Sequence, residues 1–309
     1  MSNDVVLRTR GLTKRFGKRG AVDGLNLEVR RGQVFGFLGP NGAGKTTTIR
    51  LLLGLVRPNG GDAELFGVSI RRQRLEALRR VGAMVETPAF YEHLSGERNL
   101  ALLSALSGGA TREQIHEVLE TVGLLGRERD KVGTYSHGMK QRLGIAQALL
   151  PSPELLILDE PASGLDPEGL WEVRDLIRRL GADGGLTIFL SSHLLHEVEQ
   201  TCSHVGIIRE GKLVAAGSVA ELLGSEGQTT MVRVDDAPRA AQALSGHAFV
   251  SVAEVGDGWL SILTDHDRLA DVNSVLVAAG LRVSALAPAR MTLEEAYLRI
   301  AGGGGGGTQ

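Results

Sequence analysis

Apolar residues in the first 220 positions follow two kinds of spacing. Residues 5–10 and 25–30 roughly alternate between apolar and polar side chains, which predicts strands. Short apolar runs, typical of buried strands, follow at 34–39, 81–86, 154–160 and 186–192. Helical patterns separate them at 46–56, through much of 88–150, at about 168–180 and at 193–201. Strands and helices that alternate in this way predict an α/β fold with a mostly parallel sheet covered on both faces.

The long helical stretch, 88–150, contains a sequence signal for the start of one helix. Thr111 and Gln114 have the spacing of a capping box, in which each side chain bonds the backbone N–H of the other residue. Apolar residues recur behind it at helical spacing, at Ile115, Val118, Leu119 and Val122. We therefore expect a helix to begin after Thr111 and to bury one face.

The pattern changes after a glycine- and serine-containing stretch at 224–228. A strand (229–236), a helix (238–246), two strands (249–255 and 259–265) joined by a turn at 256–258, a helix (268–280), a strand (281–288) and a last helix (291–301) are predicted. The order β-α-β-β-α-β is that of a ferredoxin-like α+β domain. We expect one domain at 1–225, a second at 226–301 and a flexible glycine-rich tail at 302–309.

Composition narrows the classes of protein. The 309 residues include 34 basic and 36 acidic side chains, and the pI near 6.5 argues against a nucleic-acid-binding surface. The single cysteine, Cys202, excludes a disulfide framework within the chain and fits a reducing cytosol. No apolar stretch reaches the ~18 residues that would span a bilayer, and the first ten residues lack a signal-peptide core.

A phosphate-binding loop stands out among the 42 glycines. Residues 39–46 read GPNGAGKT, which matches G-x-x-x-x-G-K-[ST] between a predicted buried strand and a predicted helix. Gly42 and Gly44 allow the backbone to curl around phosphate oxygens, and the helix after them directs its N-terminal dipole at the same point. Lys45 is expected to contact the β- and γ-phosphates, and the Thr46 hydroxyl to hold Mg²⁺.

A second acidic element follows another buried strand. Asp159 and Glu160 come directly after four apolar residues, at the carboxyl end of a predicted parallel strand. Open α/β sheets bind their ligands at this edge. Because neighbouring side chains on a strand point to opposite faces, Asp159 is expected to face a metal ion and Glu160 a water molecule.

These motifs occur in an order that resembles the ATP-binding subunit of an ABC (ATP-binding cassette) transporter, over about residues 5–220. The phosphate loop is its Walker A motif, and Leu155–Asp159 its Walker B motif. The family's signature motif reads YSHGM at 135–139, its D-loop SGLD at 163–166, and its switch histidine is His193. The variants in these motifs resemble the antibiotic- and multidrug-export branch of the family, the bacitracin- and tetronasin-type ATPases. The resemblance implies a P-loop NTPase core of RecA-like form with a helical subdomain at about 88–150.

The resemblance also implies roles for individual residues. Catalysis would fall to Glu160 as general base, with His193 and Lys45 at the γ-phosphate. Mg²⁺ would be held by Thr46, Asp159 and Glu86. ATP would contact Phe16, which stacks on adenine, together with Gly39, Asn41, Gly42, Gly44, Lys45, Thr46, Thr47, Glu86, Ser136, Gly138 and Asp166. In this family the signature residues act on the ATP of a partner subunit.

Two positions depart from the usual pattern of the family. Glu86 stands where a glutamine is expected, and it adds negative charge near a triphosphate. His137 replaces the first signature glycine, and Tyr135 opens that motif. These changes leave open a nucleotide-gated binding switch with little hydrolysis, although Lys45, Asp159, Glu160 and His193 favour an ATPase. Phe16 remains open to a second interpretation as a core residue.

The resemblance finally implies partners. The chain would pair with a second ATPase subunit, identical or related, and would power a separate transmembrane permease from the cytoplasmic face of a bacterial membrane. Pro88, Phe90 and Tyr91 lie in the segment that meets the permease in this family. The cargo would be a drug, an antibiotic or a lipid-like molecule. An ABC protein acting on ribosomes or DNA is disfavoured by the single cassette and the lack of a basic tail; no nucleic acid is expected.

Overall fold

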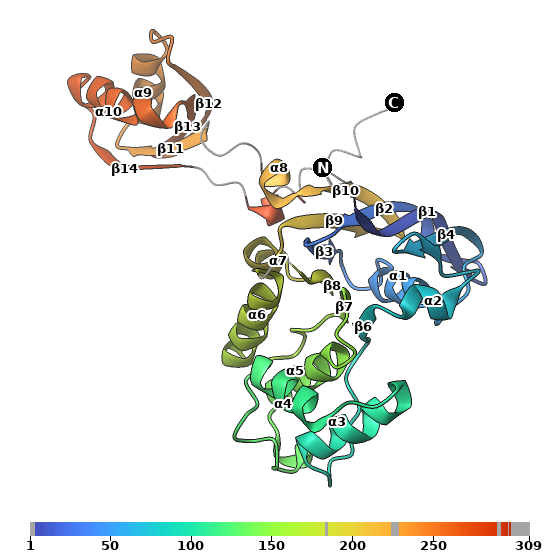
Figure 1. Ribbon diagram of the computed structural model, residues 1–309. Coiled ribbons are helices and arrows are strands. Elements are labelled where there is room, and N and C mark those ends of the chain that lie inside the picture. The colour runs from blue at the N-terminus through green and yellow to red at the C-terminus, as the bar shows by residue number, and fades with distance from the viewer. Residues whose placement is uncertain (1–3, 183–184, 224–228, 289–291, 296, 298–309) are drawn as a thin grey trace. The chain divides into compact units, whose positions relative to one another are not determined.

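The computed structural model describes residues 4–182, 185–223, 229–288, 292–295 and 297. Its contacts divide the chain into two compact units, one reaching Val219 and the other formed by Ala220–Arg299. Figure 1 shows the helices and strands of both. The predicted linker (224–228), most of the predicted last helix (291–301) and the tail (302–309) lie outside the described residues.

A six-stranded sheet forms the centre of the first unit. Its strand order is β10-β9-β3-β8-β7-β6, and every neighbouring pair is parallel except β9 with β10. The strands are β3 (Val34–Leu38), β6 (Val81–Met84), β7 (Leu155–Asp159), β8 (Thr187–Ser192), β9 (His204–Arg209) and β10 (Lys212–Ser218). The predicted parallel sheet is thus confirmed, and β9 and β10 are additions to it.

A second sheet in this unit was not predicted. Its order is β2-β1-β4-β5 with antiparallel pairing, from β1 (Val5–Phe16), β2 (Arg19–Arg30), β4 (Gly60–Leu65) and β5 (Val68–Ser69). The strands expected at 5–10 and 25–30 therefore belong to a separate antiparallel layer. The physical reason lies in their alternation, because half-buried strands suit a sheet with one face on the core and one on solvent.

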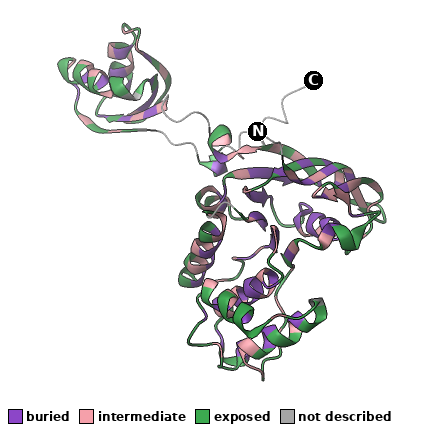
Figure 2. Ribbon diagram, in the orientation of Figure 1, coloured by how far each residue is buried: buried purple, intermediate pink, exposed green. Residues whose placement is uncertain are grey.

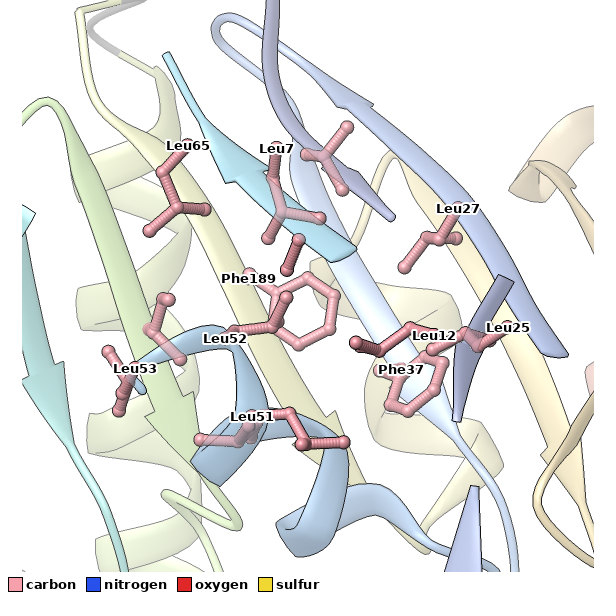
Figure 3. Close-up of a cluster of buried hydrophobic side chains, with 14 of the residues drawn as sticks. Leu7, Leu12, Leu25, Leu27, Phe37, Leu51, Leu52, Leu53, Leu65 and Phe189 are labelled. Atoms are coloured by element: carbon pink, nitrogen blue, oxygen red, sulfur yellow. The ribbon is translucent and has the colours of Figure 1, made fainter. Parts of the chain in front are cut away.

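The apolar core joins the two sheets through helix α1 (Lys45–Leu52). Figure 3 shows Leu7 and Leu65 of the antiparallel sheet in one apolar cluster with Phe37 and Phe189 of the parallel sheet and with Leu52. The opposite face of the parallel sheet meets α7, since a Cβ at Gly36 would lie 2.4 Å from Val198. The two faces of β3 thus contact different layers, as its continuous burial requires (Figure 2).

The remaining helices of the first unit are α2 (Arg74–Leu78), α3 (Gly96–Ser104), α4 (Arg112–Thr121), α5 (His137–Leu149), α6 (Pro167–Ala182), α7 (Leu195–Thr201) and the short 3-10 turns η1 (Ala105–Ser107) and η2 (Val132–Thr134). Of these, α2, α5, α6 and α7 contact the sheets, whereas α3 and α4 pack against α5 (Figure 1). The capping box between Thr111 and Gln114 is confirmed at the start of α4. Within the described part of the chain, no helix combines the length and the apolar character that crossing a membrane requires.

Cys202 lies at the end of α7 and has the structural role that its surroundings suggest. It is buried, and its sulfur would lie 3.0 Å from a Cβ placed at Gly36. Burial raises the pKa of the Cys202 thiol, so the reactive thiolate is disfavoured.

The second unit begins near helix α8 (Val219–Leu223) and contains one sheet of order β12-β13-β11-β14, with antiparallel pairing throughout. Its elements are β11 (Thr229–Val234), α9 (Ala237–Leu244), β12 (Val250–Gly256), β13 (Trp259–Thr264), η3 (His266–Arg268), α10 (Leu269–Ala278) and β14 (Val283–Pro288). Apart from the short η3, this is the predicted element order. Val232, Leu260 and Ile262 pack with Ala240 and Leu276 of the two helices into a core of its own.

Candidate functional site

The phosphate loop runs from β3 into α1 along a path that side chains would obstruct. Gly44 has φ of 113°, and a Cβ there would lie 2.3 Å from the carbonyl oxygen of Ala21. Only glycine tolerates both that dihedral angle and that approach. The helix begins at Lys45, so the backbone N–H groups of its first turn, which have no partner within the helix, lie at the loop. An anion-binding site requires such donors.

Lys45 lies within the loop rather than in solvent. Its side chain is 5% exposed, and its Nζ donates to the carbonyl oxygens of Gly39 at 2.7 Å and Pro40 at 3.3 Å. The same Nζ lies 3.2 Å from Oε1 of Glu160. A cation held by two carbonyls and one carboxylate has a fixed position at the start of α1, where it attracts a phosphate.

Asp159 is the buried member of the acidic pair. Its Oδ1 accepts hydrogen bonds from the Ser191 hydroxyl at 2.6 Å and the Thr46 hydroxyl at 3.3 Å. Ser191 also accepts from the backbone N–H of Glu160 at 2.9 Å. One hydroxyl on β8 therefore orients the side chain of Asp159 and the backbone of Glu160 together.

Glu160 turns away from the strand into the left-handed region, with φ of 49°. One of its carboxylate oxygens meets Lys45, and the other lies 2.7 Å from Nδ1 of His193. His193 follows β8, the strand next to β7 in the sheet. Three residues that are far apart in the chain therefore form one continuous ionic and hydrogen-bonded group.

A pocket of about 590 Å³ opens over this group. The predicted residues that line it are Phe16, Asn41, Gly42, Gly44, Lys45, Thr46, Thr47, Glu160 and His193. Gly39 and Asp159 do not line the pocket, but they accept hydrogen bonds from Lys45 and Thr46, which do. Phe16 is 51% exposed at the end of β1, with Nζ of Lys14 4.9 Å from its ring centroid, so it is not a core residue.

The pocket also contains residues that sequence reasoning missed. Arg19, Ala21 and Ser163 line it. Arg19 pairs directly with Phe16 across the β1–β2 hairpin, so a hairpin prediction would have brought it to the pocket. Ser191 lies two residues before His193 in the motif SSH, and a hydroxyl at the end of a buried strand was the available signal.

Besides Gly39 and Asp159, four predicted site residues do not line this pocket within the described part of the chain: Glu86, Ser136, Gly138 and Asp166. Glu86 has φ of 61° and forms an ion pair with Arg50 of α1. The other three gather elsewhere, at the N-terminus of α5, together with Tyr135, His137, Ser163 and Gly164. We call residues 135–138 and 163–166 together the signature cluster.

The signature cluster is held by local bonds. Ser136 caps α5 by accepting from the N–H of Met139 at 3.1 Å, and Asp166 accepts from the N–H of Gly169 at 3.0 Å. A Cβ at Gly138 would lie 3.3 Å from the Cα of Gly169, so α5 and α6 approach closely there. His137 Nε2 lies 3.3 Å from the carbonyl oxygen of Ser163, which joins the cluster to the pocket wall.

Tyr135 connects the start of the signature cluster to the backbone of Arg127. It is buried, and its hydroxyl donates to the carbonyl oxygen of Arg127 at 2.7 Å. Burial raises the pKa of the Tyr135 phenol, with the carboxylate of Asp130 acting in the same direction. The tyrosine that opens this motif is therefore a neutral packing residue, whereas Ser136 and His137 are exposed.

The residues around Thr46 fit Mg²⁺ better than a metal that needs several protein ligands. Among the described residues, no group of three or more histidine, cysteine, aspartate or glutamate side chains could hold a metal ion. Mg²⁺ is usually held by one or two carboxylates, retained water and substrate phosphates. The adjacent hydroxyl of Thr46 and carboxylate of Asp159 offer that donor set.

Comparisons with known proteins show the family of the chain. A family profile described as "ABC transporter" matches residues 22–163. The chain is 42% identical to the bacitracin transport ATP-binding protein BcrA of Bacillus licheniformis, over 97% of this chain and 98% of that protein. It is 36% identical to the daunorubicin/doxorubicin resistance ATP-binding protein DrrA of Streptomyces peucetius, over 96% and 92% of the two chains.

Solved structures match about 70% of the chain. CbiO1 from Clostridium perfringens, part of the ABC transporter complex CbiONQ, superimposes with a TM-score of 0.65 and 26% identity, over 71% of this chain and 90% of that chain. An ATP-binding subunit of another ABC transporter matches with a TM-score of 0.61 and 29% identity, over 70% and 91%. The chain belongs to the ABC transporter family as an ATP-binding subunit, an ATPase whose hydrolysis is coupled to transport.

Proposed function

We propose that two ATPase subunits, identical or related, close head to tail over two Mg·ATP molecules and hydrolyse them to drive an exporter. The observation that carries this proposal is the contact of Glu160 with both Lys45, at 3.2 Å, and His193, at 2.7 Å, inside the pocket. These contacts support a role of Glu160 as the acid that would accept a proton, with Lys45 and His193 as the groups that would hold the γ-phosphate.

ATP binding would use the backbone of the loop more than its side chains. Gly39, Asn41, Gly42, Gly44 and Thr47 would surround the phosphates together with Lys45, and Phe16 would stack on adenine. The 51% exposure of Phe16 and the 5% exposure of Lys45 support these different roles. The ring offers a free face at the pocket rim, and the ammonium group offers a fixed charge at its base.

The metal would lie beside the phosphates. Thr46 and Asp159 would hold Mg²⁺, with Glu86 as a further ligand. The ion, when bound, would neutralise charge that develops on the phosphoryl oxygens. Ser191 supports this role of Asp159 because its hydroxyl already orients the carboxylate.

Hydrolysis would proceed by attack of water on the γ-phosphorus. The water oxygen forms the new bond, its proton passes to the Glu160 carboxylate, and ADP leaves with the electrons of the broken P–O bond. His193 would keep the γ-phosphate in line, while its Nδ1 stays on Glu160. The imidazole would therefore orient both the γ-phosphate and the Glu160 carboxylate.

A second copy would complete the site. Ser136, Gly138 and Asp166 do not line the pocket of their own chain, and Ser136 and Asp166 are exposed. On a partner subunit they would donate to the γ-phosphate bound in the first pocket. This division between two surfaces supports the head-to-tail dimer, in which ATP binding closes the pair and hydrolysis releases it.

The transported cargo would belong to the drug, antibiotic or lipid-like class. Two relatives are named for bacitracin transport and daunorubicin/doxorubicin resistance. The cargo would cross a separate transmembrane permease, with the ATPase at the cytoplasmic face of a bacterial membrane. Tyr91 is 51% exposed in the segment 88–91 and supports a permease contact there. The membrane protein that co-purifies with the full chain identifies this partner.

The C-terminal region, 226–301, would be a ferredoxin-like accessory domain that stabilises the dimer or regulates it. The order β-α-β-β-α-β and a separate apolar core support this proposal. A chain without 226–309 is expected to bind ATP normally and to dimerise or support transport less well. Unchanged dimerisation and transport would contradict the accessory role.

Glu160→Gln tests the proposed chemistry. The amide cannot take the proton, so we expect steady-state phosphate release to fall by about 10²–10⁴-fold while ATP still binds. ATP should then trap a dimer that sedimentation velocity detects. Equal phosphate release by the wild-type chain and the variant would contradict the role of Glu160.

A further inference from the structure

The resemblance does not explain why position 86 holds a glutamate instead of a glutamine. The structure shows an ion-pair partner for this carboxylate. Its Oε1 forms an ion pair with the guanidinium of Arg50. The two residues are 36 positions apart and come from different elements, since Arg50 lies in α1 and Glu86 follows β6. Neither the motifs nor the comparisons assign a role to Arg50.

Arg50 lies one helical turn beyond the nucleotide loop. It is the fourth residue after Thr46 on α1, and residues at this spacing share one face of a helix. Thr46 lines the pocket. The side chain of Arg50 is 40% exposed, so its substitution removes charge without opening a cavity in the core.

Glu86 lies at the same sheet edge as the catalytic acids. β6 pairs in parallel with β7, with Met84 opposite Leu158, so both strands end together and Glu86 follows at the level of Asp159 and Glu160. Its φ of 61° lies in the left-handed region. A glutamine at this position would meet the same backbone restriction, so Glu86→Gln changes the charge alone.

Each carboxylate at this edge has its own compensating group. Glu160 contacts Lys45 and His193, Asp159 accepts two hydroxyl hydrogen bonds, and Glu86 pairs with Arg50. A triphosphate adds several negative charges at the same edge. Without a counter-charge, the Glu86 carboxylate would repel it, because the interaction of like charges persists over a pocket of this size.

We propose that Arg50 is the counter-charge that allows a glutamate at position 86 to lie beside bound Mg·ATP, so that nucleotide affinity depends on Arg50 and Glu86 as one unit. This inference rests on the proposed function of the pocket and deepens it. It explains how the acidic variant of this motif remains compatible with an ATPase: the added charge is accompanied by an arginine on the neighbouring helix.

The test is a double-mutant cycle in the full-length chain, with Mg·ATP as the probe. Arg50→Gln should weaken Mg·ATP binding about tenfold in the Glu86 chain and less than about twofold in the Glu86→Gln chain. Glu86→Gln alone removes the carboxylate and keeps a carbonyl oxygen for Mg²⁺, so it serves as the second background of the cycle and not as a neutral control. Arg50→Lys should keep most of the affinity, because it keeps the charge.

A matched control comes from another exposed pair. Arg8 lies 2.7 Å from Glu28 in the antiparallel sheet, and neither lines the pocket, so Arg8→Gln should leave Mg·ATP binding unchanged. Higher salt should shrink the defect of Arg50→Gln, since an exposed charge is screened. Thermal unfolding of each variant separates this effect from a loss of folded protein.

The outcomes separate this inference from the function on which it rests. An equal defect of Arg50→Gln in both backgrounds, or no defect in either, would overturn the coupling while the ATPase proposal stands. A wild-type chain that fails to bind Mg·ATP would instead contradict the function of the pocket.

Discussion

The nucleotide pocket and the signature cluster differ in where their polar groups point. In the pocket, Glu160 contacts Lys45 at 3.2 Å and His193 at 2.7 Å, and Lys45 is 5% exposed. In the signature cluster, Ser136 and His137 are exposed, and the bonds they make are to nearby backbone. The polar groups of one region therefore contact one another within a single chain, whereas the other region presents its polar groups outward.

This difference separates two kinds of function within one fold. A group of charges that compensate each other can hold ATP without help. An exposed serine at a helix N-terminus can meet an anion that another surface brings. Substitutions in the pocket should therefore change binding by the isolated subunit, and substitutions in the signature cluster should change only steps that require two subunits.

The largest effect is expected from Lys45→Ala. The substitution removes the cation of the loop and leaves Glu160 without its closest charge, so the Kd for Mg·ATP should rise roughly hundredfold. Isothermal titration calorimetry measures this directly. Lys212→Ala, which removes an exposed lysine near Asp23, is the control and should bind normally. Normal binding by Lys45→Ala would contradict the expectation that the pocket, unlike the signature cluster, determines Mg·ATP binding by the isolated subunit.

Ser136→Ala should show the opposite profile. Mg·ATP should bind with the wild-type Kd, while ATPase activity falls about tenfold or more, since a donor to the transition state is lost. The lost helix cap costs about 1 kcal/mol of stability. Ser136→Asp keeps the cap, so it should unfold normally and yet be inactive, because its carboxylate repels the γ-phosphate. Wild-type turnover by both variants would rule out a role across the interface.

Ser191→Ala tests how the pocket orients its two acids. Asp159 loses a donor and the N–H of Glu160 loses its acceptor, so the free energy of unfolding should fall by about 1–3 kcal/mol. The Mg²⁺ concentration for half-maximal ATPase activity should also rise. Ser192→Ala is the matched control, since that hydroxyl accepts from the N–H of Leu194. An identical Mg²⁺ dependence in both variants would reduce Ser191 to a structural residue.

The smallest effect is expected from Tyr135→Phe. Loss of the hydrogen bond to Arg127 should cost about 1 kcal/mol, with little change in Mg·ATP affinity. The pKa of Tyr135 is raised in the folded chain, so its contribution to stability is present below the pKa of an unfolded tyrosine, about 10, and is lost as pH rises through the folded value. The melting temperature of the wild type should therefore fall more steeply above about pH 10 than that of the variant. Parallel curves would contradict this.

Sequence reasoning worked best where the signal is local. The loop 39–46, the acids after β7 and the capping box at Thr111 all depend on residues within a few positions of one another. The element order of the second unit was predicted for the same reason, because the turn at 256–258 and the apolar periodicity are local signals. The antiparallel sheet was missed because β4 pairs with β1 across some fifty residues, and such pairing leaves no local signal.

The sequence by itself determined which chemical groups this protein has and the order in which they come: a phosphate loop, two acids, a histidine and a signature serine. Tertiary structure decided which groups meet. Lys45 reaches Glu160, Ser191 joins Asp159 to the backbone of Glu160, and Arg50 compensates Glu86, because the ends of parallel strands distant in the chain lie at one sheet edge. Spacing along the chain encodes local geometry, whereas strand neighbours follow from packing of the whole core.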